Sequence, residues 1–366
     1  MRVDVVDPSA FTPPYDRSLS AALARQGADV RLVTSRFDYG PVPPADGYEV
    51  DERFYRFAPG RPGSRLRFAA KLAQHVPDML RYRRAARDAD VVHFQWLPVQ
   101  HLDARLLPRD RPVVLTAHDV LPREPRRGQV DAQRRLYDRV DAVVVHSHHG
   151  RERLVVDLEV PSERVHVIPH GAFDYLERQE HEEPLPPELA EVEGPVVLFF
   201  GLLRPYKGID VLLEAWRGIG GAELWVVGMP RMPLKPLRER ATPSVRFFPR
   251  FVDDAQVPAL FRRADLVVLP YRDIDQSGVL ATALAFGRPL LLSAVGGFPE
   301  VAETGAAELV APGDSAALHL ALRRLLEDEP RRDALAIAAR AAAAGPYSWD
   351  TVAARHVELY RSLIDR

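Results

Sequence analysis

Short apolar runs alternate with longer amphipathic segments along almost the whole chain, and this alternation constrains the fold more than any other feature. In the first half the strand-like runs are 3–6, 29–34, 91–94, 113–116, 142–145 and 165–168. In the second half they are 196–200, 223–227, 245–248, 266–269, 289–293 and 308–310. Strands that alternate with helices form parallel sheets with helices on both faces. The sequence therefore predicts an α/β fold of doubly wound sheets.

The segment 175–194 breaks this pattern, because glutamate and proline dominate it. Such a composition is typical of a linker. We therefore expect an N-terminal Rossmann-like domain over 1–176, a linker over 177–194 and a second Rossmann-like domain over 195–349, with a cleft between the domains. The helical segment 350–366 has an apolar face and is expected to pack back on the first domain.

Composition limits the classes of function. The net charge of -2 over 366 residues gives no general attraction to nucleic acid, so no nucleic-acid partner is expected. The lack of cysteine excludes disulfides, a thiol nucleophile and a Cys-ligated zinc site, and it agrees with a cytoplasmic location. Met1 leads almost directly into the first strand, and no apolar run approaches the roughly 20 residues that span a bilayer. We expect no signal peptide and at most peripheral membrane contact.

The stretch 199–208 carries the strongest functional signal. A buried strand ends at Gly201, and Arg204 and Lys207 follow just before Gly208 and a helical segment. Free backbone N–H groups and the helix dipole favour an anion at such a turn. Arginine can fork onto phosphate oxygens, and lysine adds a compact charge. The sequence predicts a diphosphate site here, the alternative being two solvated loop cations.

The tandem arrangement and the motifs of the second half resemble glycosyltransferase family 4. The motifs that carry this resemblance are Phe200-Gly201 to Lys207-Gly208, Val226-Val227-Gly228, 264–270, 283–289 and 295–300. Members of that family have the GT-B architecture, two Rossmann-like domains that face each other across a cleft. The resemblance implies a retaining transferase of class EC 2.4 that uses a nucleoside diphosphate sugar as donor substrate and no other cofactor. It implies a glycan, lipid-linked or small-molecule acceptor.

The departing diphosphate needs positive charge, which Arg204 and Lys207 supply in this interpretation. Leu202 stands where family members often carry an arginine, so Arg204 is expected to take over that contact. No metal is expected, because adjacent residues such as His146, His148 and His149 do not converge easily on one ion.

The segment 271–284 occupies the place where the family commonly carries two glutamates eight residues apart, for the donor sugar and the ribose. Neither is present. The resemblance places Thr282 at the second position, and Asp275 is the nearest carboxylate for the first, with Asp273 as the poorer candidate. The turn Gln276-Ser277-Gly278-Val279 offers backbone N–H groups to sugar or phosphate. The alternative is a surface loop in which Ser277 caps the next helix.

Nucleotide binding is assigned to Gly228 and to the turn with Arg250 and Phe251, where an aromatic face can hold a base. Phe251 can equally be part of the core.

On the first domain, His118 follows the buried strand 113–116 and resembles the family's active-site histidine. It is expected to orient a donor hydroxyl or the acceptor, the alternative being a histidine satisfied by loop carbonyls. His93 is expected to be structural. Tyr15 and Asp16 align with a glycine pair of the family and predict a side-chain-lined acceptor mouth, although Asp16 can instead cap a helix beginning near Arg17. Gly171 is expected to give the backbone the conformational freedom of a hinge.

The segment 61–87 is basic and amphipathic. Its cations are Arg61, Arg65, Arg67, Lys71, Arg81, Arg83, Arg84 and Arg87. Such a helix can lie on an anionic membrane that carries a lipid-linked acceptor, or it can be a solvated helix face. Both interpretations stay open.

Two other classes of function compete with a transferase. The missing glutamates allow a sugar-nucleotide-binding GT-B protein with altered catalysis. A dinucleotide-dependent oxidoreductase is disfavoured, because neither 3–10 nor 196–208 contains the G-x-G-x-x-G turn.

Overall fold

The computed structural model describes residues 1–40, 42–121 and 127–366, which form two compact units. The first unit consists of residues 1–171 and 349–366, and the second of residues 172–348. Each unit contains one fully parallel sheet, so the predicted α/β fold with two doubly wound sheets is confirmed. Among the described residues, every helix is too short or too polar to span a bilayer.

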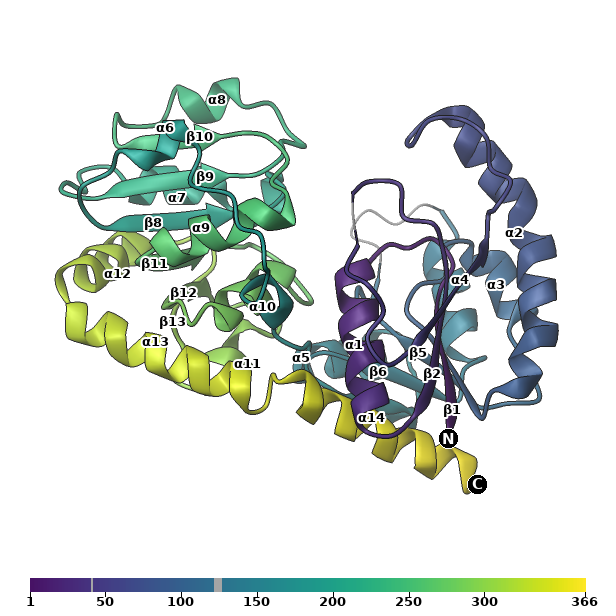
Figure 1. Cartoon of the computed structure of the whole chain (residues 1–366). Helices are drawn as coiled ribbons and strands as arrows, with labels where there is room; N and C mark the ends of the chain where they lie inside the picture. Colours follow the sequence, from purple (N-terminus) through teal and green to yellow (C-terminus); the bar gives the residue numbers. More distant parts are fainter. Residues whose placement is uncertain (41, 122–126) are drawn as a thin grey trace. The chain divides into compact units, whose positions relative to one another are not determined.

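The first sheet has seven strands in the order β3-β2-β1-β4-β5-β6-β7. Figure 1 labels β1, β2, β5 and β6 of this sheet. They are β1 (Arg2–Asp7), β2 (Asp29–Ser35), β3 (Glu49–Phe54), β4 (Val91–Phe94), β5 (Val113–Thr116), β6 (Ala142–Val145) and β7 (Val165–Val167). The central strands are valine-rich and buried on both faces, as expected of a parallel sheet covered by helices. The sequence analysis missed β3, because this edge strand is mostly charged and partly exposed.

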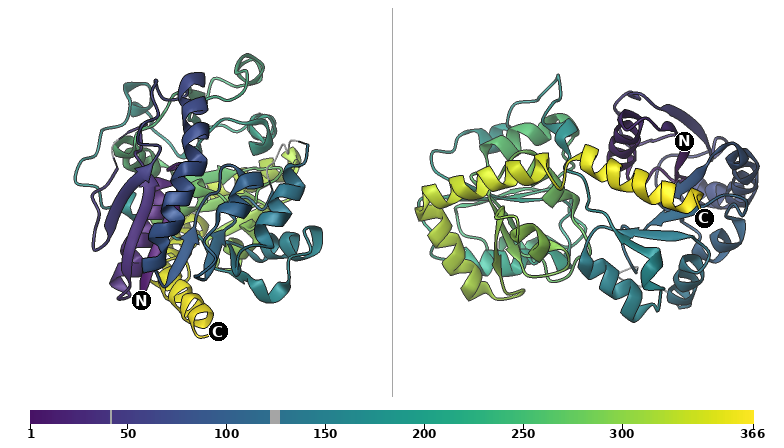
Figure 2. Two further views of the ribbon diagram at one scale, coloured as in Figure 1. Left: turned by 90° about the vertical axis from the view of Figure 1, so that its right-hand side faces the viewer. Right: turned by 90° about the horizontal axis from the view of Figure 1, so that it is seen from below.

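Helices cover both faces of this sheet. They are α1 (Pro13–Arg25), α2 (Arg65–Ala85), η1 (Ala86–Asp88), α3 (Gln100–Leu106), α4 (Gln129–Tyr137), α5 (His148–Glu152), η2 (Arg153–Asp157), η3 (Ser162–Arg164) and α14 (Trp349–Ile364). The last helix, α14, lies beside α1 within the first unit, as both views of Figure 2 show. Tyr360 of α14 reaches the fully buried His93 of β4, with 2.6 Å between the hydroxyl and Nδ1. His93 also contacts Thr116 Oγ1 at 2.7 Å, which confirms its structural role.

The second sheet has six strands in the order β10-β9-β8-β11-β12-β13. They are β8 (Val196–Phe200), β9 (Glu223–Val227), β10 (Val245–Phe248), β11 (Leu266–Leu269), β12 (Leu290–Ser293) and β13 (Ala307–Val310). Its helical segments are η4 (Asp174–Leu176), α6 (Pro187–Ala190), η5 (Pro205–Lys207), α7 (Ile209–Ala215), α8 (Lys235–Arg238), η6 (Asp254–Gln256), α9 (Val257–Arg263), α10 (Gly278–Ala285), α11 (Phe298–Ala302), α12 (Ser315–Glu327) and α13 (Glu329–Ala344). The core is built around Phe199, Trp216, Trp225 and Phe261.

The glutamate- and proline-rich segment 177–194 lies within the second unit. Leu189 is 1% exposed and belongs to the core of that unit, and Glu182 forms an ion pair with Arg262. The boundary between the units follows Gly171 rather than residue 176. At Gly171 a side chain would come within 2.4 Å of the Trp349 ring, so close packing accounts for the glycine.

Candidate active site

The strand order of the second sheet reverses at β8. This strand pairs with β9 on one side and with β11 on the other, so the loops after β8 and β11 leave the same edge of the sheet in opposite directions. Ligands of open α/β sheets bind in the crevice at such a switch point. The loop after β8 contains Gly201, Arg204 and Lys207, the residues predicted to hold the diphosphate.

Two glycines let the surrounding loops approach one another. Gly228, after β9, has φ of +135°, and a Cβ there would lie 2.0 Å from the carbonyl oxygen of Gly201. Gly208 has φ of +68°, and a Cβ there would lie 2.0 Å from the carbonyl oxygen of Pro270. Backbone therefore packs directly on backbone at this edge, which only glycine permits.

Lys207 folds back over the turn. Its side chain is 6% exposed, and Nζ lies 2.9 Å from the position that a Cβ on Gly201 would occupy. Nζ also lies 4.9 Å from the centre of the Tyr271 ring. The ammonium group therefore stands over the predicted phosphate turn. Arg204 is exposed and forms no ion pair within the part of the chain that the structure describes.

The loop after β11 is fastened to the Lys207 turn. Arg272 donates to both carboxylate oxygens of Asp210, at 2.9 and 2.6 Å, and its backbone N–H donates to the carbonyl of Tyr206 at 2.8 Å. The hydrogen bonds from Arg272 lower the pKa of Asp210, so this clamp is ionised at neutral pH. The clamp holds the two loops in one arrangement.

The turn 275–279 follows this clamp. Asp275 is buried, whereas Asp273 is exposed. Ser277 accepts from the N–H of Leu280 at 3.4 Å and caps α10, which confirms the capping part of the alternative. The surface-loop part is wrong, because Ser277 is buried. Gln276 Oε1 is buried and accepts no hydrogen bond from the described residues. A buried oxygen of this kind can accept a hydrogen bond from a bound ligand.

Thr282 lies one turn into α10. Its side chain is 5% exposed, and its hydroxyl donates to the carbonyl of Gly278 at 3.0 Å. Because the Thr282 hydroxyl donates within its own helix, it can only accept a hydrogen bond from a ribose hydroxyl. Val279 Cγ2 would lie 3.0 Å from a Cβ on Gly201, which places the start of α10 against the phosphate turn.

The predicted base-binding turn follows β10. The guanidinium of Arg250 lies 3.9 Å from the centre of the Phe248 ring, and Phe251 is 56% exposed. The alternative that Phe251 packs in the core is wrong, because its ring is largely exposed to solvent. An exposed aromatic face beside an arginine remains suited to stacking.

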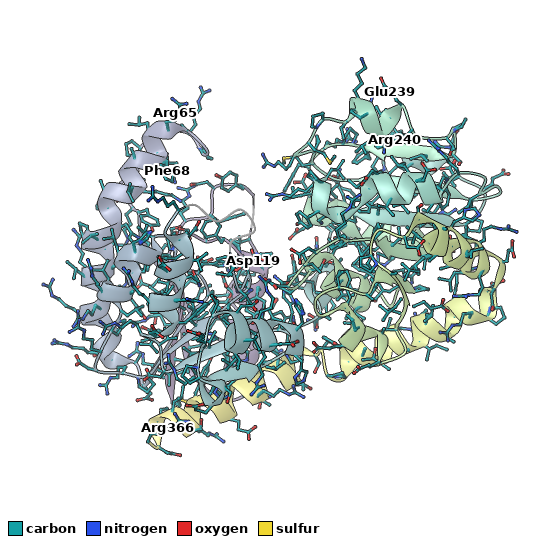
Figure 3. All side chains as sticks on the ribbon, turned by 180° about the vertical axis from the view of Figure 1, so that it is seen from behind. Arg65, Phe68, Asp119, Glu239, Arg240 and Arg366 are labelled. Carbon is teal, nitrogen blue, oxygen red and sulfur yellow. The ribbon has the colours of Figure 1, made fainter. Side chains whose placement is uncertain are left out.

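The first sheet has a switch point of its own, where β1 pairs with both β2 and β4. A cavity of about 230 Å³ lies at this edge, lined by Phe11, Gln95, Trp96 and His118 among others. Asp119, labelled in Figure 3, also lines it. Trp96 stacks on His118, with 5.1 Å between ring centres and 14° between the planes. His118 is therefore held flat at a cavity wall.

His118 belongs to a chain of hydrogen bonds that begins at a carbonyl. His146 Nδ1 lies 3.0 Å from the carbonyl oxygen of Ile168, and His146 Nε2 lies 3.3 Å from His118 Nδ1. Burial lowers the pKa of His146 to about 4, so this ring is neutral at pH 7. A carbonyl only accepts, so His146 donates from Nδ1 and accepts at Nε2, and His118 donates from Nδ1.

His118 Nε2 then keeps a lone pair, 3.3 Å from Oε1 of Gln95. Two acceptors repel, so the Gln95 amide satisfies His118 with its NH2 group, which has no other acceptor among the described residues. Burial, and then the neighbouring His146, lower the pKa of His118 well below its usual value. His118 is thus a neutral ring at the cavity wall, and its Nε2 accepts from the Gln95 amide. The alternative of loop carbonyl partners for His118 is wrong within the described ranges.

Tyr15 and Asp16 do not line an open mouth. Each is 1% exposed, and the Tyr15 ring packs against His118 and His170, with 4.7 and 5.0 Å between centres. Helix α1 begins at Pro13 rather than near Arg17, which turns both side chains inward and excludes Asp16 as its N-cap. The cavity beside His118 is bordered by Phe11 and Trp96 rather than by these two residues.

Asp16 forms a buried pair with Asp7 at the end of β1. Asp7 accepts from the backbone N–H groups of Phe11 and Thr12 at 2.5 and 3.2 Å, and so shapes the loop after β1. Thr12 Oγ1 lies 3.3 Å from Asp16 and accepts from the Trp96 indole at 3.0 Å. Burial, and then the charge of Asp7, raise the pKa of Asp16 well above its usual value, so the pair holds a proton.

The sequence analysis missed His146 and His170 as neighbours of His118. The three histidines follow β5, β6 and β7, which are adjacent in the sheet. A histidine just after each of three successive parallel strands was the available signal, because the carboxyl ends of such strands share one edge. His148 and His149 lie in α5, and no group of metal-binding side chains is found among the described residues.

Two sequence families match the chain. A model described as Glycosyl transferases group 1 matches residues 194–328, and one described as Glycosyltransferase Family 4 matches residues 17–172. Among curated relatives, a D-inositol 3-phosphate glycosyltransferase of Xylanimonas cellulosilytica is 26% identical, over 96% of this chain and 91% of the relative. A phosphatidyl-myo-inositol mannosyltransferase of Mycobacterium leprae is 36% identical, over 46% of this chain and 47% of the relative.

A GDP-mannose:glycolipid 4-beta-D-mannosyltransferase of Xanthomonas campestris is 32% identical over 49% of each chain, so this match and the mycobacterial one span about half of the relative's length. Solved structures share the fold over the whole chain. Sucrose-phosphate synthase of Thermosynechococcus elongatus has a TM-score of 0.76 at 20% identity, over 100% of this chain and 99% of the other. Anabaena HepE in complex with UDP-glucose has a TM-score of 0.73 at 20% identity, over 99% and 100%.

Proposed function

Because this chain belongs to the group 1 and family 4 glycosyltransferases, we propose that it transfers a sugar from a nucleoside diphosphate sugar, with retention, to a glycolipid or small-molecule acceptor. The names of relatives support this donor and acceptor class, since they include GDP-mannose, glycolipid and inositol 3-phosphate. UDP-sugars are the other donors to test, because HepE was solved with UDP-glucose.

The placement of Lys207 carries the proposal. A nearly buried ammonium group over Gly201, at the switch point of the second sheet, is suited to the charge that develops on a departing diphosphate. Arg204 is free to fork onto the same phosphates, and the N–H groups at the start of α10 add neutral donors. No metal ion is required in this scheme, because the two cations and the turn supply the stabilisation.

Roles for the remaining residues follow from their surroundings. Buried Asp275 and the orphan oxygen of Gln276 accept from hydroxyls of the donor sugar. Thr282 offers its lone pair to the ribose, Gly228 lets the backbone approach the nucleotide, and Arg250 and Phe251 hold the base. On the first unit, a substrate hydroxyl in the cavity displaces the Gln95 amide and donates to His118 Nε2. The leaving phosphate takes the acceptor proton.

Lys207→Ala tests the proposal. Transfer with the best of a panel of UDP- and GDP-sugars should fall about 100-fold or more, because a preorganised cation at the leaving group is lost. Lys235→Ala is the matched control, since Lys235 is exposed and its one ion-pair partner among the described residues is Glu239, at 3.9 Å. Both variants should keep the wild-type melting temperature within a few degrees. Undiminished transfer by Lys207→Ala would refute the assignment of the site.

A second candidate is a sugar-nucleotide-binding protein with altered catalysis. The commitment of the Thr282 hydroxyl to Gly278, where relatives commonly carry a glutamate, favours it. Calorimetry with donors, run beside hydrolysis and transfer assays, separates the two. Tight donor binding without turnover across the acceptor panel supports the second candidate.

We also assign peripheral membrane contact to the segment 61–87. Large apolar side chains are exposed at the start of α2 and just before it, with Phe57 at 80%, Phe68 at 71% and Leu66 at 62%. Arg61 and Arg65 lie among them and suit an anionic surface. Flotation with neutral and with anionic vesicles tests this, and equal partitioning into both would remove the electrostatic part.

A further inference from the structure

The first unit contains a second cavity, of about 410 Å³, whose lining shares no residue with the cavity beside His118. It lies after β2 and β3, next to the N-terminal half of α2. Its wall includes Ser35, Arg36, Arg56, Arg67 and Lys71. Nothing in the proposed transfer reaction uses these residues.

Lys71 is the central cation of this cavity. Its side chain is half-buried, and no carboxylate lies within ion-pair distance of it in the described part of the chain. Burial, and then the neighbouring Arg67, lower the pKa of Lys71. A half-buried ammonium group without a counter-ion is stabilised by any anion that enters.

The other charges leave the cavity positive. Arg67 is paired with Asp38, and Arg56 lies 3.6 Å from Asp51. Arg36 is exposed and forms no ion pair within the described ranges. Glu52 is the remaining acid at the wall, and it is exposed. Four cations therefore face two carboxylates, of which one is already neutralised by Arg67.

Ser35 gives an independent indication of a ligand. Its side chain is 3% exposed, and Oγ has no hydrogen-bond partner among the described residues although it lines the cavity. Buried hydroxyl groups nearly always have a partner. An oxygen of an anion in the cavity would provide one.

Tyr55 holds Lys71 in place. Its ring centre lies 5.2 Å from Lys71 Nζ, and its hydroxyl lies 2.8 Å from His75 Nδ1, while His75 Nε2 lies 2.5 Å from Asp103. Burial raises the pKa of Tyr55, so the phenol stays neutral and does not compensate Lys71. Tyr55 has φ of +55°, which lies in the left-handed region that favours glycine.

We propose that this cavity binds a phosphate group, as a monoester or diester, through Lys71 and Ser35, with Arg36 and Arg56 at its mouth. Phosphate suits the cavity because its several oxygens can accept from a hydroxyl and from more than one cation at once. The inference deepens the proposed function and rests on it, since it gives the acceptor, or the lipid surface that presents it, a phosphate. Arg65 and Phe68, labelled near the N-terminal end of α2 in Figure 3, lie close in sequence to Arg67 and Lys71.

The first experiment titrates the full-length protein with inorganic phosphate and with glycerol 3-phosphate, observed by calorimetry and by the ¹⁵N signal of Lys71. Binding should raise the Lys71 pKa, and Lys71→Gln and Ser35→Ala should each weaken it about tenfold or more. Lys235→Gln is the control and should bind as wild type does. Melting temperatures identify any variant that fails to fold, and Lys71→Gln alone is then decisive.

The second experiment separates the sources of the phosphate. Vesicles of phosphatidylcholine with and without phosphatidylglycerol are floated with wild type and Lys71→Gln, in the presence and absence of glycerol 3-phosphate. Competition by glycerol 3-phosphate indicates a lipid headgroup in the cavity, and phosphate binding without any vesicle effect indicates a soluble phosphorylated acceptor. Both support the proposal. No phosphate binding by wild type, or equal binding by Lys71→Gln, overturns it.

Titration with UDP and GDP distinguishes this inference from the proposed function. Nucleotide binding should be unchanged in Lys71→Gln and Ser35→Ala, because neither residue belongs to the second unit. Loss of phosphate binding with intact nucleotide binding leaves the transferase assignment standing. Intact phosphate binding in a protein that binds no nucleotide would refute the transferase assignment alone.

Discussion

The ammonium group of Lys207 lies 4.9 Å from the centre of the Tyr271 ring, and Tyr271 itself is fully buried. The ring comes from the loop after β11 and the lysine from the loop after β8, so this contact joins both sides of the switch point. A π-face can hold a cation without neutralising it. Tyr271 therefore positions the ammonium group without adding a negative charge beside it.

Replacing the ring tests this contact. Tyr271→Leu should weaken nucleoside diphosphate binding about 3- to 30-fold, the range expected of a desolvated cation–π contact, whereas Tyr271→Phe should retain most of the affinity. Calorimetry with the preferred nucleotide measures both variants. Equal losses in Leu and Phe would mean that the hydroxyl, rather than the ring, holds Lys207.

Gly228 should be intolerant of any side chain. A Cβ would lie 2.0 Å from the carbonyl oxygen of Gly201, so Gly228→Ala is expected to lower the unfolding free energy by about 3 kcal/mol or more. Gly218→Ala is the matched control, because Gly218 also has positive φ, +79°, but nothing within 4 Å, and its cost should be about 1 kcal/mol. Urea unfolding measures both, and similar values would contradict the close packing of the two loops.

His146 should fix the tautomer of His118. In ¹⁵N spectra of wild type both rings should carry their proton on Nδ1, because the chain starts at the Ile168 carbonyl. In His146→Phe, His118 should shift toward the Nε2–H form, and transfer should slow about tenfold or more. His101→Asn, at an exposed site, is the control. An Nε2–H ring at His118 in wild type would exclude this arrangement.

The Asp7–Asp16 pair should make stability depend on pH. The folded-state pKa of Asp16 lies well above its usual value, so the folded protein binds more protons than the unfolded chain, and stability falls as pH rises from about 4 through the folded pKa. Asp16→Asn imitates the protonated acid and removes this term. Between pH 5 and 9, the melting temperature of the variant minus that of wild type should increase as pH rises. A constant difference would mean that Asp16 is ionised in the fold.

Much of the second unit could be predicted from the sequence, because its signals are local. The strand before Gly201, the two cations and the capping serine at 277 lie within short stretches whose backbone is set by glycine and helix chemistry. The fastening of Arg272 to Asp210 spans 62 residues and depends on two loops meeting. No local pattern indicates such a contact.

The first unit was harder to predict. Tyr15 and Asp16 look like surface residues after a strand, but the helix starts earlier, at Pro13, and a shift of a few residues on a helix changes the face that each presents. The phosphate cavity was missed because it needs Ser35, Tyr55 and Lys71 from three separate elements. Burial without a partner, which marks Ser35, can be recognised only once the chain is folded.

The first unit is discontinuous in sequence, since α14 belongs to it while residues 172–348 form the other unit. During synthesis, residues 172–348 can fold as soon as they leave the ribosome, and the N–H of Ala172 already meets the carbonyl of Tyr347 at 2.8 Å. The first unit lacks one of its buried contacts until α14 has joined it, because Tyr360 of α14 covers His93 of β4. The core of the first unit is therefore completed only after the whole of the second unit has been synthesised.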